Sequence, residues 1–293
     1  MKNTDVNIRD PYVLLHEGVY YLYGTRSSSC WGQADGFDCY KSEDLENWDG
    51  PFEVFHRPDG FFADRNYWAP ECIFRDGGFR LITTLASENR KKGVYVLAAD
   101  SPLGPFKALS DKPLTPAEWN CIDGSVFEDA DGRLWLLFSR CFEDNARGDM
   151  MAVELKADFS GAQSEPILLF SALDAPWSSP VPFAKAEFGM DGDVYFSDGP
   201  CIHKMADGGL IMLWSSWSAR GYAVGAAKSS NGMVSGPWTH LPEPLFPENG
   251  GHGMVFCTKD GQYFYAMHYP NDRYMERPVF RKLKETNDRL ELV

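Results

Sequence analysis

Three aspartates lead three short motifs that lie far apart in the chain: Asp10, Asp123 and Asp198. Each stands directly before Pro or Gly, a position where an aspartate often does no more than stabilise a turn. Gathered at one pocket, however, such groups can do chemistry, because one carboxyl can protonate a leaving oxygen while another activates water. That division of labour is what glycoside hydrolysis requires.

The motif that each aspartate leads occurs five times. Every copy contains a short apolar strand, a turn with Asp, Glu or Gly, and a second, almost continuously apolar strand, which is the pattern of a β-hairpin. Successive copies begin roughly 55 to 75 residues apart, near the upper end of the periods of repeat proteins. The copies are residues 10–24, 69–85, 123–140, 198–215 and 251–268.

A second pattern recurs between the hairpins. Gly-Pro followed by an aromatic residue occurs at 50–52, 104–106 and 236–238, each time between two β-rich segments, which gives each unit two more strands. Five four-stranded units predict an all-β fold, a five-bladed β-propeller. A β-sandwich is the alternative, but a sandwich has no reason to repeat the same corner.

Composition limits the possible partners. The repeats follow one another without a linker, so residues 1–293 are predicted to form a single domain, and no apolar run reaches the ~18 residues of a membrane span. The net charge of -14 argues against nucleic acid and anionic membranes, and favours a neutral small molecule. The seven cysteines show no CxxC pair, so no zinc site is predicted. The start of the chain has no apolar signal segment, which predicts a cytoplasmic protein.

The propeller places the aspartates together. The innermost strand of each blade runs along the central axis, so the residues that begin the five hairpins converge at one mouth of the channel. Asp10, Asp123 and Asp198 are therefore expected around a single pocket.

Five motifs, taken together, resemble a known family. Their order and spacing over nearly the whole chain resemble the blade motifs of glycoside hydrolase family 43. The resemblance implies an inverting five-bladed propeller that acts on α-L-arabinofuranosides or β-D-xylosides, with some galactan-degrading members. It also implies that Asp10 is the general base, and that Asp123 orients the general acid and raises its pKa. The motifs are residues 7–13, 67–71, 122–127, 197–200 and 250–253.

The fourth motif departs from the family pattern. Where the family usually has Glu-Gly-Pro or Glu-Ala-Pro with Glu as acid, this chain has Asp198-Gly-Pro. One methylene less moves the carboxyl by about an ångström, a distance to which catalysis is sensitive. Asp198 is taken as the acid; Glu187, in the preceding loop, or no residue at all, is the alternative.

Five further residues are candidates for substrate binding. Trp68 and Trp177 could stack on a sugar, or belong to the core. Glu71 could accept a hydrogen bond from a sugar hydroxyl, or only from backbone donors. Arg277 could donate to sugar hydroxyls or pair with a catalytic carboxylate, or form only a surface ion pair. His252 resembles the axial histidine that holds water or a cation in many family members. No cofactor is required and no metal is predicted, although a cation or ordered water near His252 fits the resemblance.

These features predict an exo-acting α-L-arabinofuranosidase on arabinose-containing plant oligosaccharides. The loops 27–38, with Trp31, and 174–193 are long enough to enclose a pocket for one terminal sugar. A β-xylosidase or endo-arabinanase of the same family is the alternative, as is a carbohydrate-binding propeller with impaired catalysis. Oligomeric state is not predicted.

Overall fold

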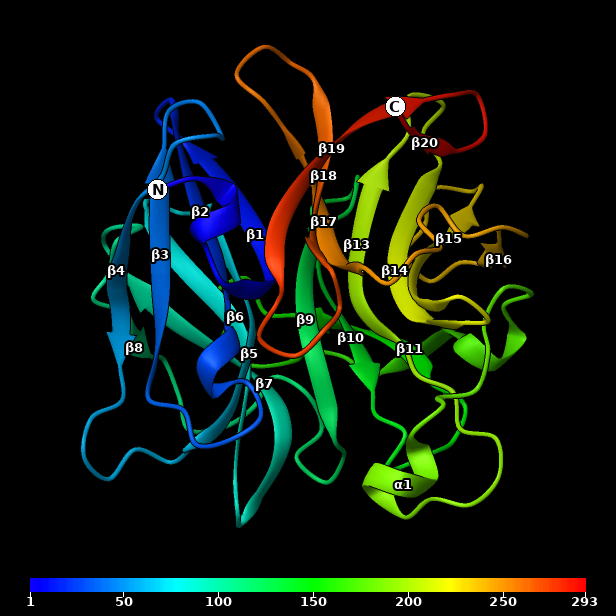
Figure 1. The fold of residues 1–293 in the computed structure, drawn as a ribbon, viewed down its shortest axis with the longest axis horizontal. Coiled ribbons are helices and arrows are strands. Elements are labelled where there is room, and N and C mark those ends of the chain that lie inside the picture. The colour runs from blue at the N-terminus through cyan, green and yellow to red at the C-terminus, as the bar shows by residue number, and fades with distance from the viewer.

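The computed structural model describes residues 1–293 as five four-stranded antiparallel sheets arranged around a central axis (Figure 1). Blades 1 and 2 comprise β1 (Ile8–His16), β2 (Val19–Arg26), β3 (Gly36–Ser42), β4 (Asp49–His56), β5 (Arg65–Arg75), β6 (Gly78–Ser87), β7 (Arg90–Ala99) and β8 (Lys107–Ala108). Blade 3 comprises β9 (Cys121–Glu128), β10 (Leu134–Arg140), β11 (Asp149–Leu155) and β12 (Ile167–Ser171). Blades 4 and 5 comprise β13 (Asp198–Lys204), β14 (Leu210–Ser218), β15 (Gly221–Ser229), β16 (Thr239–His240), β17 (Gly251–Cys257), β18 (Tyr263–Tyr269), β19 (Arg277–Glu285) and β20 (Leu290–Leu292).

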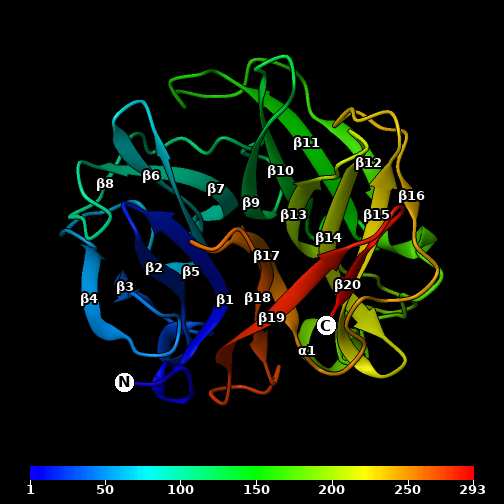
Figure 2. The ribbon, with the colours of Figure 1, turned by 90° about the horizontal axis from the view of Figure 1, so that it is seen from above.

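The predicted five-bladed β-propeller is confirmed. Figure 2 shows the first strands of the blades near the centre of the ring and strands such as β4 and β8 at its outside. Helix is confined to α1 (Ala184–Phe188) and three short 3-10 turns, η1 (Asn3–Asp5), η2 (Ser27–Ser29) and η3 (Ala172–Asp174). No helix of the chain has the length and apolar character needed to cross a membrane.

Turn residues set the hairpin registers. Glu17 and Gly18 both have positive φ and close β1 on β2 with His16 opposite Val19. Asp76 and Gly77 do the same for β5 and β6. Two consecutive residues with positive φ match the natural twist of a hairpin. This explains why an acidic residue followed by Gly occurs at both turns.

The core consists of five large apolar clusters, one at each interface between neighbouring blades. Between blades 3 and 4, for example, Trp135 and Met150 pack with Trp214. All seven cysteines are free and six of them are buried, in agreement with a packing role.

The ring is closed by side chains, because each sheet consists of consecutive strands of a single blade. The Asn7 side-chain amide donates to the carbonyls of Tyr274 (3.1 Å) and Glu276 (2.9 Å). The Arg277 guanidinium donates to the carbonyl of Thr4 (2.8 Å). These bonds tie the start of the chain to blade 5.

Candidate active site

One residue near the start of each inner strand has a left-handed backbone conformation. In all five blades the inner strand skips pairing partners at this residue. A bulge bends a strand and re-aims its side chains, so the five residues converge on the axis. We call them the head residues: Asp10 (φ 52°), Ala69 (45°), Asp123 (60°), Gly199 (52°) and His252 (42°).

The head residue of blade 4 is Gly199, so the expectation that Asp198 occupies the same position as Asp10 and Asp123 is wrong. Asp198 lies one residue earlier, directly opposite Ser215 on β14. A Cβ at residue 199 would lie 3.0 Å from ring atoms of His252. Gly199 thus leaves room for the imidazole, and the carboxyl reaches the centre from the neighbouring position.

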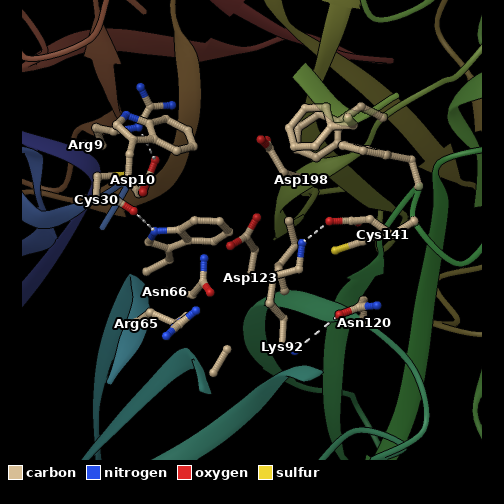
Figure 3. A pocket seen from close by; sticks show the side chains of 18 of the residues that line it. Arg9, Asp10, Cys30, Arg65, Asn66, Lys92, Asn120, Asp123, Cys141 and Asp198 are labelled. Carbon is tan, nitrogen blue, oxygen red and sulfur yellow. Dashed lines mark hydrogen bonds and ion pairs between the residues drawn. The ribbon is translucent and has the colours of Figure 1, made fainter. Parts of the chain in front are cut away.

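The three aspartates nevertheless meet around one imidazole. Nδ1 of His252 lies 3.4 Å from Oδ1 of Asp10, 3.8 Å from Oδ2 of Asp123 and 3.8 Å from Oδ1 of Asp198. All four residues are buried, and the aspartates lie around a common space in Figure 3. We call Asp10, Asp123, Asp198 and His252 the central cluster.

Asp10 is held in its ionised form. Burial alone would raise its pKa, but the nearby His252, followed by Arg9, brings the pKa of Asp10 well below its usual range. The Thr25 hydroxyl also donates to Oδ2 at 2.6 Å. An ionised carboxylate with a fixed orientation is suited to act as a general base.

Asp198 is held in its protonated form. Burial raises its pKa well above the usual range, and the negative charge of Asp10 adds to the effect. The Tyr222 hydroxyl lies 2.6 Å from both carboxyl oxygens and opposes this rise only in part. A carboxyl whose pKa is raised in this way is suited to act as a general acid.

Asp123 also has a raised pKa. Burial raises the pKa of Asp123 to about 7, with His252 opposing and the charges of Asp198 and Asp10 reinforcing the rise. Its backbone N–H donates to the Thr84 hydroxyl at 2.9 Å. Neighbouring buried carboxyls disfavour simultaneous ionisation, so Asp123 and Asp198 are not both ionised easily.

The cluster opens into a cavity of about 880 Å³. Loop residue Trp31 and strand residue Trp68 form one wall, with their rings edge to face at 5.9 Å. The guanidinium groups of Arg9 and Arg273 lie 5.3 Å and 5.1 Å from the centre of the Trp31 ring. Trp68 donates its indole N–H to the Cys30 carbonyl at 2.7 Å, which fixes the ring at the cavity wall.

Glu187, the alternative acid, lies at the rim of the cavity and not in the central cluster. It belongs to α1, its side chain is 42% exposed, and Arg273 donates to its carboxylate at 2.9 Å. This ion pair links the loop before blade 4 with the loop between β18 and β19. Glu187 therefore helps to form the wall.

Trp177 and Arg277 do not contact the cavity, which corrects both predictions. Trp177 is buried between blades 3 and 4, packs on Trp214 at 4.9 Å, and covers Gly225 so closely that a Cβ there would clash with its ring. Arg277 contacts the carbonyls of Thr4 and Glu276. Trp177 therefore serves core packing, and Arg277 serves ring closure.

Glu71 also lies outside the cavity lining. Burial raises the pKa of Glu71 to about 8; a bond from Ser125 opposes the shift and the charge of Asp123 adds to it. This places the carboxyl in the interior of the ring near Asp123, so the expected hydrogen bond to a sugar hydroxyl is not supported.

Sequence reasoning missed the groups that tune the cluster: Arg9, Thr25, Tyr222, His268 and Glu276. Glu276 is fully buried and accepts bonds from Arg9 (2.7 Å) and Ser27 (2.8 Å). Arg9 could have been noticed, because it directly precedes Asp10 in the first motif. The others lie on second and third strands, or in the loop that leads into β19, where no motif marks them.

A cation would find three protein ligands in the central cluster. Asp123, Asp198 and His252 offer one ligand atom each within 4.8 Å of one another. Both oxygens of Asp198, however, are within hydrogen-bond distance of the Tyr222 hydroxyl, and Ca²⁺ prefers six to eight oxygen ligands. No catalytic step is therefore assigned to a metal ion.

A β-propeller with oppositely tuned carboxyl groups in the lining of a cavity has the groups that glycoside hydrolysis requires. The chain belongs to Glycosyl hydrolases family 43, which it matches over residues 4–287. The family resemblance noted in the sequence is thus confirmed.

Individual relatives differ in the activity that their names give. A solved structure described as an endo-arabinase from Bacteroides thetaiotaomicron is 34% identical, with a TM-score of 0.90 over 99% of this chain and 98% of that chain. An endo-1,4-β-xylanase structure from the same organism is 24% identical, with a TM-score of 0.77 over 100% of this chain and 96% of that chain. A β-D-galactofuranosidase of Aspergillus niger is 24% identical and covers 92% of this chain and 76% of its own length.

Proposed function

We propose that the chain is an inverting, exo-acting α-L-arabinofuranosidase for arabinose-containing plant oligosaccharides. The observation that carries the proposal is that the pKa values of Asp10 and Asp198 are shifted in opposite directions within one buried cluster. Ionised Asp10 acts as the base that activates water. Protonated Asp198 acts as the acid that protonates the leaving oxygen, and Asp123 supports its proton.

The distances to His252 set an upper limit on the separation of the two carboxyl groups. Oδ1 of Asp10 and Oδ1 of Asp198 lie 3.4 Å and 3.8 Å from the same nitrogen of His252, so they cannot be farther apart than these two distances combined. Inverting enzymes place their carboxyls about 6.5–9.5 Å apart, to admit a water molecule.

The arabinofuranosyl substrate is supported by the 34% identical relative, whose description names an endo-arabinase. Exo action is supported by the walls around the cavity. Trp31, α1 and the Arg273–Glu187 ion pair line the cavity beside the central cluster, and walls of this kind favour a terminal sugar over a chain that passes through.

Endo-arabinanase activity is the second candidate. Besides the relative's description, the volume of about 880 Å³ favours it, because ligand pockets span roughly 300–1,000 Å³ and this cavity lies near the upper end. A cavity of this size has room for sugar units on both sides of the scissile bond.

Two assays test the proposal. Nitrophenyl α-L-arabinofuranoside, β-D-xyloside and β-D-galactoside are compared as substrates, and the products from linear arabinan are separated by size. We expect hydrolysis of the arabinofuranoside with free arabinose as the first arabinan product. Early release of oligosaccharides would assign endo action, and preference for the xyloside or galactoside would refute the arabinoside assignment.

A further inference from the structure

One position of the propeller is occupied by a hydroxyl residue in four blades and by histidine in the fifth. It lies on the second strand, opposite the residue that precedes the head residue, so the strand register defines it unambiguously. The five pairs are Arg9 with Thr25, Trp68 with Thr84, Ile122 with Ser139, Asp198 with Ser215, and Gly251 with His268.

In three blades this hydroxyl accepts the backbone N–H of the next blade's head residue. The bonds are Ala69 N to Thr25 Oγ1 (2.8 Å), Asp123 N to Thr84 Oγ1 (2.9 Å) and His252 N to Ser215 Oγ (2.9 Å). In blade 3, Ser139 instead bonds to Ser197. The bond holds a peptide that the left-handed conformation leaves without a strand partner.

His268 does the same for Asp10, whose N–H donates to Nδ1 at 3.3 Å. Because Nδ1 accepts, the ring proton lies on Nε2, which donates to Oδ1 of Asn271 at 3.0 Å. The same oxygen accepts from Arg9 at 2.9 Å, and Arg9 is anchored by the fully buried Glu276. A hydroxyl could accept the Asp10 N–H, but it could not reach Asn271 as well.

The imidazole is itself held firmly. It is fully buried and stacks on the Tyr222 ring at 5.7 Å with an interplanar angle of 13°. The charged and titratable groups that face it are Asp10, Arg9, His252 and Tyr222. Burial, followed by Arg9, lowers the pKa of His268, which agrees with the neutral tautomer that the hydrogen bonds require.

We propose that His268 is a positioning residue for Asp10, and that its imidazole braces the base between the Asp10 backbone and the Asn271–Arg9–Glu276 network. This inference rests on the proposed function, because it assigns Asp10 the role of base. Its physical basis is that a shift of about 1 Å in a catalytic group can reduce turnover by about 10²-fold.

Three substitutions of His268 distinguish the role of its hydrogen-bond acceptor, Nδ1, from that of the imidazole ring as a whole. His268→Asn keeps an acceptor near the position of Nδ1, His268→Gln moves it toward Nε2, and His268→Leu removes it. With nitrophenyl α-L-arabinofuranoside, we expect kcat to fall about 10²-fold for the Leu and Gln variants and less than about tenfold for the Asn variant. KM should change less than about threefold in all three. Equal kcat losses for the Asn and Leu variants, or wild-type kcat in the Leu variant, would overturn the inference.

His203→Gln is the matched control, because His203 is also buried and bonds to a carboxylate, Glu285, at 3.1 Å, but lies outside the cavity. It should keep wild-type kcat. If the Leu variant does not fold, the comparison of kcat between the Asn and Gln variants decides whether His268 positions Asp10.

Crystal structures of the His268 variants give a readout that is independent of activity. We expect the Asp10 peptide to leave its left-handed conformation in the Gln and Leu variants and to keep it in the Asn variant. An inactive wild-type enzyme on every glycoside would refute the proposed function. An undisturbed Asp10 in the Gln and Leu variants would refute the positioning role.

Discussion

Asp10 and Asp198 are the same residue type, yet their surroundings move their pKa values in opposite directions. Both are buried, so desolvation does not distinguish them. Asp10 faces Arg9, His252 and His268, whereas Asp198 faces Asp10 and a tyrosine hydroxyl. The neighbours therefore decide which carboxyl is the base and which is the acid.

Asp123 offers a test of this electrostatic account through stability. Its pKa of about 7 exceeds the ~3.9 of an unfolded chain, so between these values the folded state binds a proton that the unfolded state has lost. Wild-type stability should therefore fall as pH rises from about 4 to 7, by up to ~1.4 kcal/mol per pH unit from this group. Asp123→Asn removes this contribution.

We expect Asp123→Asn to unfold at a higher temperature than the wild type at pH 8, with the difference shrinking toward pH 4. Thermal unfolding followed by circular dichroism across this range measures the effect. An unchanged difference between pH 4 and pH 7 would show that Asp123 is ionised in the folded protein.

At the scale of elements, the hairpin repeat and the Gly-Pro corners were sufficient to predict the blades, because strand alternation and turn chemistry are local properties. The offset of Asp198 was not predictable, because the position of a bulge depends on pairing with the second strand. Trp177 was misassigned for a related reason. Its loop lies against β15, where Gly225 makes space for the ring, and no local pattern reveals that contact.

Two tryptophan substitutions distinguish the cavity wall from the core. Trp177→Ala should lower the free energy of unfolding by about 3–5 kcal/mol, because it empties a packed site, while KM stays near the wild-type value. Trp68→Ala should raise KM for the aryl arabinofuranoside several-fold with a smaller loss of stability. Denaturant unfolding and steady-state kinetics on both variants measure this, and a reversed pattern would contradict the assignment.

At the scale of the whole molecule, the propeller brings together residues that are more than 240 positions apart. Asp10 and Arg9 depend on blade 5 for His268, Asn271 and Glu276, so the base is assembled only when the ring closes. The motifs predict that blades 1 and 5 meet, but not which side chains join them.

Arg277→Ala tests the ring closure. Loss of the bonds to Thr4 and Glu276 at this partly exposed site should cost about 1 kcal/mol of stability. Because Arg277 lies outside the cavity, KM should not change. Thermal unfolding and kinetics on the purified variant measure both, and a rise in KM without loss of stability would restore Arg277 as a substrate-binding residue.

The central claim, that Asp198 is the general acid opposite Asp10, is tested most directly by the leaving-group dependence of Asp198→Ala. We expect about 10²–10⁴-fold slower hydrolysis of arabino-oligosaccharides, the contribution of acid catalysis, but less than about tenfold loss with a dinitrophenyl glycoside, which departs without a proton. The alkaline limb of the wild-type pH profile, where Asp198 loses its proton, should disappear in the variant. Equal losses on both substrates with an unchanged alkaline limb would contradict the account.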